Sequence, residues 1–166
     1  IYSMNRALQK LAPKRAMPED EAKKYLHETF GLLPWTGREW AKQSDIRIIS
    51  RKGLAKELGY VALYGAGSPL SAARMGEFAG DGKLMRRAQQ MATARSYFHI
   101  TFNDPDGYRA LGNIQSISWR HTAYPCRVQY GSGYARTGLH EAAKIGDPAS
   151  IRRAQLYLES NRIYEA

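Results

Sequence analysis

The spacing of apolar residues changes near residue 97, and this change limits the folds that the chain can adopt. Before it, apolar side chains recur at helical spacing, most clearly over 84–94. After it, Tyr97–Phe102 has the composition of a strand, and an Asn-Asp-Pro-Asp-Gly turn follows. Further strands are expected at 114–119 and 127–130. Helical spacing then returns, so we predict an α+β fold, mainly helical with a small central antiparallel sheet.

Capping residues indicate where several of the helices begin. Ser3 can cap a first short helix, and Asp147 followed by Pro148 opens the last one. Thr36 and Glu39 have the T-x-x-E spacing of a capping box. We therefore expect short helices with local start signals, including one that begins at Ser68-Pro69, and a further short helix at 139–145.

Three of the expected helices carry an apolar stripe on one face, the pattern typical of a helix packed on a core. The stripes are Met4, Leu8 and Leu11 in the first helix, Leu84, Ala88 and Met91 in the 84–94 helix, and Ile151, Ala154 and Leu158 in the last. Arg86 and Arg87 lie off the stripe of the 84–94 helix.

The length of 166 residues predicts one domain spanning 1–166, with a basic N-terminal helix and linker at 1–17 that packs on a partner. A chain of this size can bury a sizeable core. Its apolar runs are too short for a membrane span of about 20 residues, so we expect no transmembrane segment.

The chain is strongly basic, and its basic residues are distributed unevenly. The net charge is +10 and the pI is about 9.8, which favours polyanionic partners. From Leu84 onward there are ten arginines and one lysine, whereas the preceding part has six arginines and eight lysines. Arginine grips phosphate or carboxylate with a planar fork of donors, so this bias predicts directional polar contacts.

Arginine and tyrosine also alternate through the second half of the chain, and both contribute to binding surfaces. Arginine contacts phosphates and tyrosine stacks on unpaired bases, as RNA recognition requires. The same pair is enriched in protein interfaces, and solvated arginines beside half-buried tyrosines are a third interpretation. The expected partner-binding residues are Arg86, Arg87, Arg95, Arg109, Arg120, Tyr124, Arg127, Tyr130, Arg136, Arg152 and Arg153.

The histidines and the single cysteine do not have the spacing of a metal site. His27, His99 and His140 are far apart, and His121 with Cys126 is the one close pair. Zinc needs three or four ligands at recognisable spacing, so we predict neither a metal nor a cofactor.

Two segments resemble lysozyme-like enzymes. Gly112, Gln115, Ser118, Ala123 and Tyr124 are similar in spacing to a stretch of phage lysozymes of the goose-type and transglycosylase superfamily. The segment 147–158 resembles a late helix of lytic transglycosylases. The resemblance implies a catalytic glutamate on a helix before the first motif, and Glu77 is the nearest candidate general acid. The alternative function is therefore cleavage of peptidoglycan glycan strands.

Together these features predict a non-catalytic structural subunit of a multi-subunit complex. It would dock on RNA, on DNA or on acidic protein surfaces, with other protein subunits as partners. One cysteine excludes an internal disulfide, which favours a reducing, intracellular compartment. Because the chain begins at Ile1, we expect a fragment or a processed product, and loss of a targeting segment would fit an organelle matrix such as the mitochondrial one.

Overall fold

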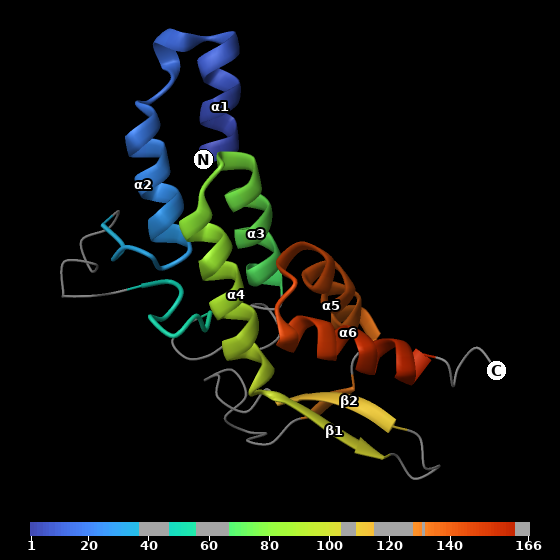
Figure 1. Ribbon diagram of the computed structural model, residues 1–166. Coiled ribbons are helices and arrows are strands. Elements are labelled where there is room, and N and C mark those ends of the chain that lie inside the picture. The colour runs from blue at the N-terminus through green and yellow to red at the C-terminus, as the bar shows by residue number, and fades with distance from the viewer. Residues whose placement is uncertain (37–46, 56–66, 104–108, 115–127, 131, 162–166) are drawn as a thin grey trace. The chain divides into compact units, whose positions relative to one another are not determined.

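Two compact units make up the chain in the computed structural model, unit 1 at Ile1–Arg51 and unit 2 at Lys52–Ala166. The structure describes residues 1–36, 47–55, 67–103, 109–114, 128–130 and 132–161, drawn as coloured ribbon in Figure 1. Six α-helices lie within these ranges. The single domain expected from length stays a prediction, because two compact units can still unfold as one cooperative domain.

Unit 1 contains a helical hairpin. Helix α1 (Tyr2–Leu11) leads through the short 3-10 helix η1 (Pro13–Arg15) into α2 (Glu19–Thr29). The two α-helices lie side by side (Figure 1). Three acidic residues occupy the first turn of α2, where carboxylates meet the positive end of the helix dipole. Pro18 is the N-cap of α2, directly before its first residue.

Helix α1 buries its polar face and exposes its apolar one. Tyr2 and Asn5 are buried, whereas Met4 is 68% exposed and Leu11 is 85% exposed. The expected packing of the Met4 and Leu11 stripe on a core is therefore wrong. Ser3 is not the cap either, because the helix starts one residue earlier and its N-cap makes no side-chain hydrogen bond.

Hydrogen bonds to the inward face of α1 explain this orientation. The Tyr2 hydroxyl donates to Glu19 Oε1 at 2.6 Å, and Gln9 Nε2 donates to Glu19 Oε2 at 3.1 Å. Asn5 exchanges two bonds with the backbone of Met17, donating to its carbonyl at 3.1 Å and accepting from its N–H at 2.9 Å. These part-buried groups would lose their partners if α1 turned its apolar stripe inward.

Thr36 serves a tertiary contact in unit 1. Its hydroxyl donates to Glu28 Oε1 at 2.7 Å, and its N–H donates to Glu28 Oε2 at 3.3 Å. The fully buried Glu28 also lies 3.8 Å from the ammonium of Lys24, one helical turn earlier. Glu39, the other half of the expected capping box, lies outside the described residues.

Unit 2 begins its described helices with a second hairpin, formed by α3 (Ser68–Ala79) and α4 (Gly82–Ser96). The turn between them uses Gly80 at φ +62°, a left-handed conformation that favours glycine. Asp81 then caps α4 by accepting hydrogen bonds from the first backbone N–H groups of that helix. The Ser-Pro start of α3 agrees with the sequence prediction.

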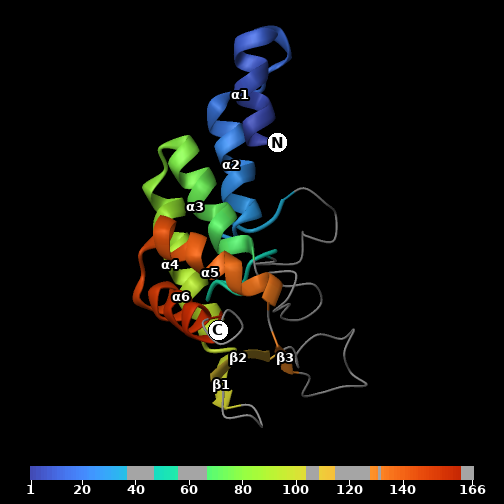
Figure 2. The ribbon, with the colours of Figure 1, turned by 90° about the vertical axis from the view of Figure 1, so that its right-hand side faces the viewer.

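Helices α5 (Ser132–Ile145) and α6 (Pro148–Asn161) complete the helical part of unit 2. Both pack against α4, and α5 also packs against α3, as Figure 2 shows from the side. Asp147 caps α6, since its Oδ2 accepts from the N–H groups of Ala149 and Ser150. The predicted Asp-Pro start is confirmed. By contrast, the helix expected from residue 139 begins at Ser132.

The apolar stripe of α4 lies in the core, as predicted. Leu84 and Ala88 have no exposed surface, and Met91 is 1% exposed. The stripe of α6 behaves differently, because Ile151 is 43% exposed and Leu158 is 52% exposed. In that helix the sequence pattern identified the wrong face.

Gly53 lets another segment of unit 2 approach the backbone of α4. Its φ is +95°, and a Cβ added there would lie 3.0 Å from the Cα of Met91. Both the conformation and the space therefore favour glycine at this position.

Three short strands pair in antiparallel order β1-β2-β3, namely β1 (His99–Asn103), β2 (Arg109–Ile114) and β3 (Val128–Tyr130). The strands have five, six and three residues, whereas the six α-helices make up most of the described chain. The predicted α+β fold with a central antiparallel sheet is wrong, and the described fold is mostly helical. Strand composition and turn signals report local pairing, whereas the core forms where helices pack on helices.

Candidate functional site

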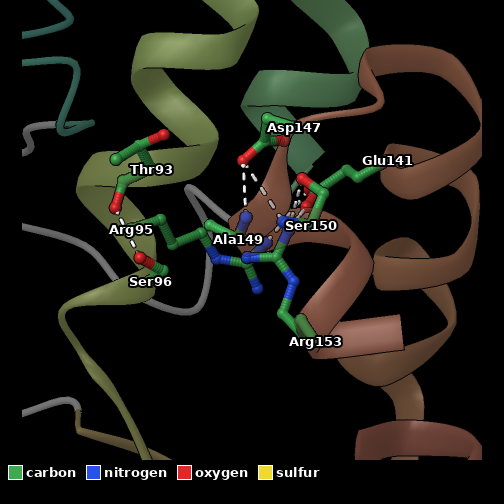
Figure 3. Close-up of polar contacts among 8 residues, drawn as sticks. All are labelled: Thr93, Arg95, Ser96, Glu141, Asp147, Ala149, Ser150 and Arg153. Carbon is green, nitrogen blue, oxygen red and sulfur yellow. Dashed lines mark hydrogen bonds and ion pairs between the residues drawn. The ribbon is translucent and has the colours of Figure 1, made fainter. Parts of the chain in front are cut away.

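A buried ionic cluster joins three helices of unit 2. Arg95 of α4 donates from Nη1 to Glu141 Oε1 of α5 at 3.1 Å, and Arg153 of α6 forms an ion pair with Glu141 Oε2. Figure 3 shows the Glu141 carboxylate with both guanidinium groups beside it. A single carboxylate therefore connects α4, α5 and α6.

Burial makes these charges interact strongly. The Glu141 side chain has no exposed surface, and the side chains of Arg95 and Arg153 are 5% and 3% exposed. Asp147 is also buried, and its hydrogen bonds go to the backbone N–H groups of Ala149 and Ser150, as the dashed lines in Figure 3 show. Removing charges from water is costly, and the attraction between Glu141 and the two guanidinium groups offsets part of that cost.

The polar groups around the cluster belong to helix ends. Arg153 Nη2 donates to the Ser150 hydroxyl at 3.4 Å, while one carboxylate oxygen of Asp147 caps α6. Near the end of α4, the Ser96 hydroxyl donates to the Thr93 carbonyl at 2.7 Å. These contacts orient helix termini and the ionic groups between them, which is a structural role for the cluster.

Three of the expected partner-binding arginines are buried within the fold. Arg95 and Arg153 belong to the ionic cluster, and Arg87, which was expected to lie off the core face of α4, is 4% exposed. The sequence analysis did not select Glu141, the carboxylate that joins two of them. Its signal is that it is the one acidic residue of the short helix expected at 139–145.

Two other expected arginines lie on the surface of unit 2. Arg86 of α4 and Arg152 of α6 are exposed, and neither has an ion pair within the part of the chain that the structure describes. Arg74 and Lys83 share both properties. These side chains are available for contacts with an external anion.

The remaining expected residues lie where side chains are not described. The backbone places Arg109 in β2, Tyr130 in β3 and Arg136 in α5. Arg120, Tyr124 and Arg127 lie outside the described residues. Their participation in a binding surface stays a prediction.

Glu77, the candidate acid of the lysozyme alternative, lies on the surface of α3. Its side chain is 59% exposed, and both of its oxygens contact the ammonium of Lys144, at 2.7 and 3.0 Å. A glycosidase acid is held protonated by an apolar environment. The described surroundings of Glu77 do not resemble such an environment and give this alternative no support.

The described residues contain neither a metal-binding group nor a membrane-spanning helix. Within the described ranges, histidine, cysteine and acidic side chains form no group of three that could hold a metal ion. None of the helices described is both long enough and apolar enough to cross a bilayer. No protein-family model, curated protein or solved structure matches the chain.

Proposed function

We propose that the chain is a non-catalytic docking subunit that binds nucleic acid through the exposed cations of unit 2, with RNA as the primary partner. The observation that supports this is a charge imbalance on the described surface of that unit. The exposed acids there are Glu77 and Glu159, and Glu77 is already paired with Lys144. The exposed cations are Lys52, Arg74, Lys83, Arg86, Lys144 and Arg152.

The buried cluster sharpens this proposal by separating two uses of arginine. Arg95 and Arg153 are buried inside the fold and share the Glu141 carboxylate, so their guanidinium groups are not available to an external phosphate. Arg86 and Arg152 keep their charge at the surface, where a guanidinium can contact a phosphate. Acidic protein surfaces are the competing partner and are an outcome of the experiment below.

The test measures binding of a fluorescently labelled mixed-sequence single-stranded RNA by anisotropy at several salt concentrations. Each phosphate contact should contribute about −0.7 to the slope of log affinity against log salt. The double variant Arg86→Ala, Arg152→Ala should bind more weakly and lose about 1.4 from the magnitude of that slope. Replacing the same two residues with lysine keeps the positive charge but removes the guanidinium fork, so this variant separates their contributions to RNA affinity.

Lys144→Ala is the matched control, because it also removes a cation but one that Glu77 already neutralises. Lys144→Ala should change the salt slope much less than replacement of either arginine. Absence of measurable RNA affinity, or an RNA affinity that hardly changes with salt concentration, would exclude the nucleic-acid proposal. Binding of an acidic polypeptide such as polyglutamate under those conditions would support the protein alternative instead.

A further inference from the structure

The exposed face of α1 has the apolar spacing of a helix-pairing seam. Ile1, Met4, Leu8 and Leu11 follow one another at intervals of three, four and three residues, as the a and d positions of a heptad do. Ile1 is 72% exposed, Met4 is 68% exposed and Leu11 is 85% exposed, while Leu8 is half-buried. Such a stripe on a helix surface is costly to leave in water.

The stripe is held outward by the contacts of the opposite face. Tyr2 and Gln9 both donate to Glu19, and Asn5 is bonded twice to the backbone of Met17. Rotating α1 to bury the stripe within unit 1 would break these four bonds. The apolar face is therefore presented by the fold and does not result from fraying of the helix.

Positive charge surrounds one end of the stripe. The first 18 residues contain four cations and no acid. Lys10, Lys14 and Arg15 are exposed and form no ion pair among the described residues, while Arg6 lies 3.7 Å from Glu19. A partner that covers Leu11 would therefore bring its own surface close to at least two unneutralised cations.

We propose that this face of α1 docks an amphipathic helix of a partner protein, with apolar side chains at three-four spacing and carboxylates facing Lys10, Lys14 and Arg15. Apolar residues on the partner are required to remove Met4 and Leu11 from water, and phosphates alone would not do so. The same face of a second copy fits poorly, because the first 18 residues contain no acid and so supply no carboxylate for these cations. The proposed seam consists of residues of unit 1, whereas the RNA-binding surface proposed above consists of residues of unit 2.

A synthetic helical peptide of about three heptads tests the proposal, with leucine at a and d and glutamate at e and g. Two comparison peptides have lysine at e and g, or the same leucine and glutamate content in scrambled order. Binding to the full chain is measured by fluorescence anisotropy. The acidic heptad peptide should bind at least about tenfold more tightly than either comparison, a difference of about 1.4 kcal/mol.

Variants of the chain locate the binding site. Leu11→Asp and Met4→Asp should each weaken binding of the acidic heptad peptide by about tenfold or more, about 1.4 kcal/mol. Leu158→Asp is the matched control, because Leu158 is a leucine of similar helical setting that is 52% exposed in unit 2. It should leave peptide affinity unchanged. Far-UV circular dichroism checks that each variant keeps its helices.

Several results would overturn the proposal. The first is absence of peptide binding, or equal binding of the scrambled peptide, which would reflect net charge alone. The second is a dimer of the chain that Leu11→Asp dissociates, which would make a second copy the occupant. The third result would make a membrane the occupant. In that case the chain binds vesicles of phosphatidylserine and phosphatidylcholine, Leu11→Asp abolishes this binding, and the acidic heptad peptide does not bind the chain. RNA affinity should be unaffected by Leu11→Asp, so the two proposals can fail separately.

Discussion

Helices α1 and α4 carry apolar stripes of similar spacing and use them in opposite ways. The Leu84, Ala88 and Met91 stripe of α4 is buried, whereas Met4 and Leu11 of α1 are largely exposed. The difference shows that periodicity locates a stripe on a helix but does not decide where that stripe points. The chemistry of the neighbouring element makes that choice.

The neighbours of the two helices differ accordingly. Helix α4 packs against α3, whose buried residues include Leu70, Ala72 and Ala73. Helix α1 meets a carboxylate at Glu19 and the backbone at Met17, which need hydrogen-bonding partners. An apolar face on α1 would leave those groups unsatisfied, at about 1–3 kcal/mol each. We therefore expect the loss of hydrogen-bonding side chains to destabilise the packing of α1, and changes in side-chain or backbone packing to destabilise that of α4.

The largest loss of stability is expected from removing Glu141, the buried carboxylate that pairs with Arg95 of α4. Glu141→Ala leaves Arg95 and Arg153 buried without their shared carboxylate, which should cost about 3–5 kcal/mol of unfolding free energy in urea. Glu77→Ala removes a carboxylate from an exposed ion pair and should cost only about 0–1 kcal/mol. Equal effects of the two variants would show that burial does not distinguish them.

The backbone of α4 should be nearly as sensitive to crowding. Gly53→Ala combines a positive φ with a Cβ placed 3.0 Å from Met91 Cα, so we expect a loss of about 2–4 kcal/mol. Gly80→Ala is the control, since it shares the positive φ but has open space, and it should cost about 1–2 kcal/mol. Thermal unfolding compares the pair, and an effect at Gly80 as large as that at Gly53 would exclude close packing as the cause.

A smaller effect is expected from the inward face of α1. Asn5→Ala removes both side-chain bonds to the Met17 backbone and should cost about 1–3 kcal/mol. Faster hydrogen exchange confined to the amides of α1 and of residues 13–17 would measure the loss locally. Ser3→Ala, at an exposed site on the same helix, should change exchange little. Protection unaltered in Asn5→Ala would show that the polar face does not hold α1.

The smallest effect concerns the pH dependence of unit 1. The pKa of Glu19 is lowered mainly by the hydrogen bond from Tyr2; partial burial opposes this, and Gln9, Arg6 and Lys23 lower it further. The stabilisation is therefore complete above the ordinary glutamate pKa of about 4.3 and is lost as the pH falls through the lowered value.

The melting temperatures of the native chain and of Glu19→Gln test this between about pH 6 and about pH 3, on either side of the glutamate pKa. Their difference should shrink as the solution becomes more acidic, because protonated Glu19 is similar to glutamine. Tyr2→Phe removes the principal donor and should flatten the dependence. A difference that grows toward low pH would contradict the sign of the shift.

Local signals in the sequence predicted parts of this fold well. Asp147-Pro148 marked the start of α6, Ser68-Pro69 marked the start of α3, and the α4 stripe was placed correctly. These features depend on neighbouring residues, whose geometry follows from the chain itself. The sequence did not distinguish buried from exposed arginines. Arg86 and Arg153 were both expected to bind a partner, yet Arg86 is exposed and Arg153 is buried.

The sequence by itself determined the basic charge, the starts of α3 and α6 and the helical period of the stripes, because each depends on composition or on contacts within a few residues. Only the tertiary structure decided that Arg95 and Arg153 share Glu141, that α1 buries Asn5 while exposing Leu11, and that helices form the described core. These outcomes depend on residues far apart in the chain, where one buried carboxylate or one backbone group can determine which face of a helix is covered.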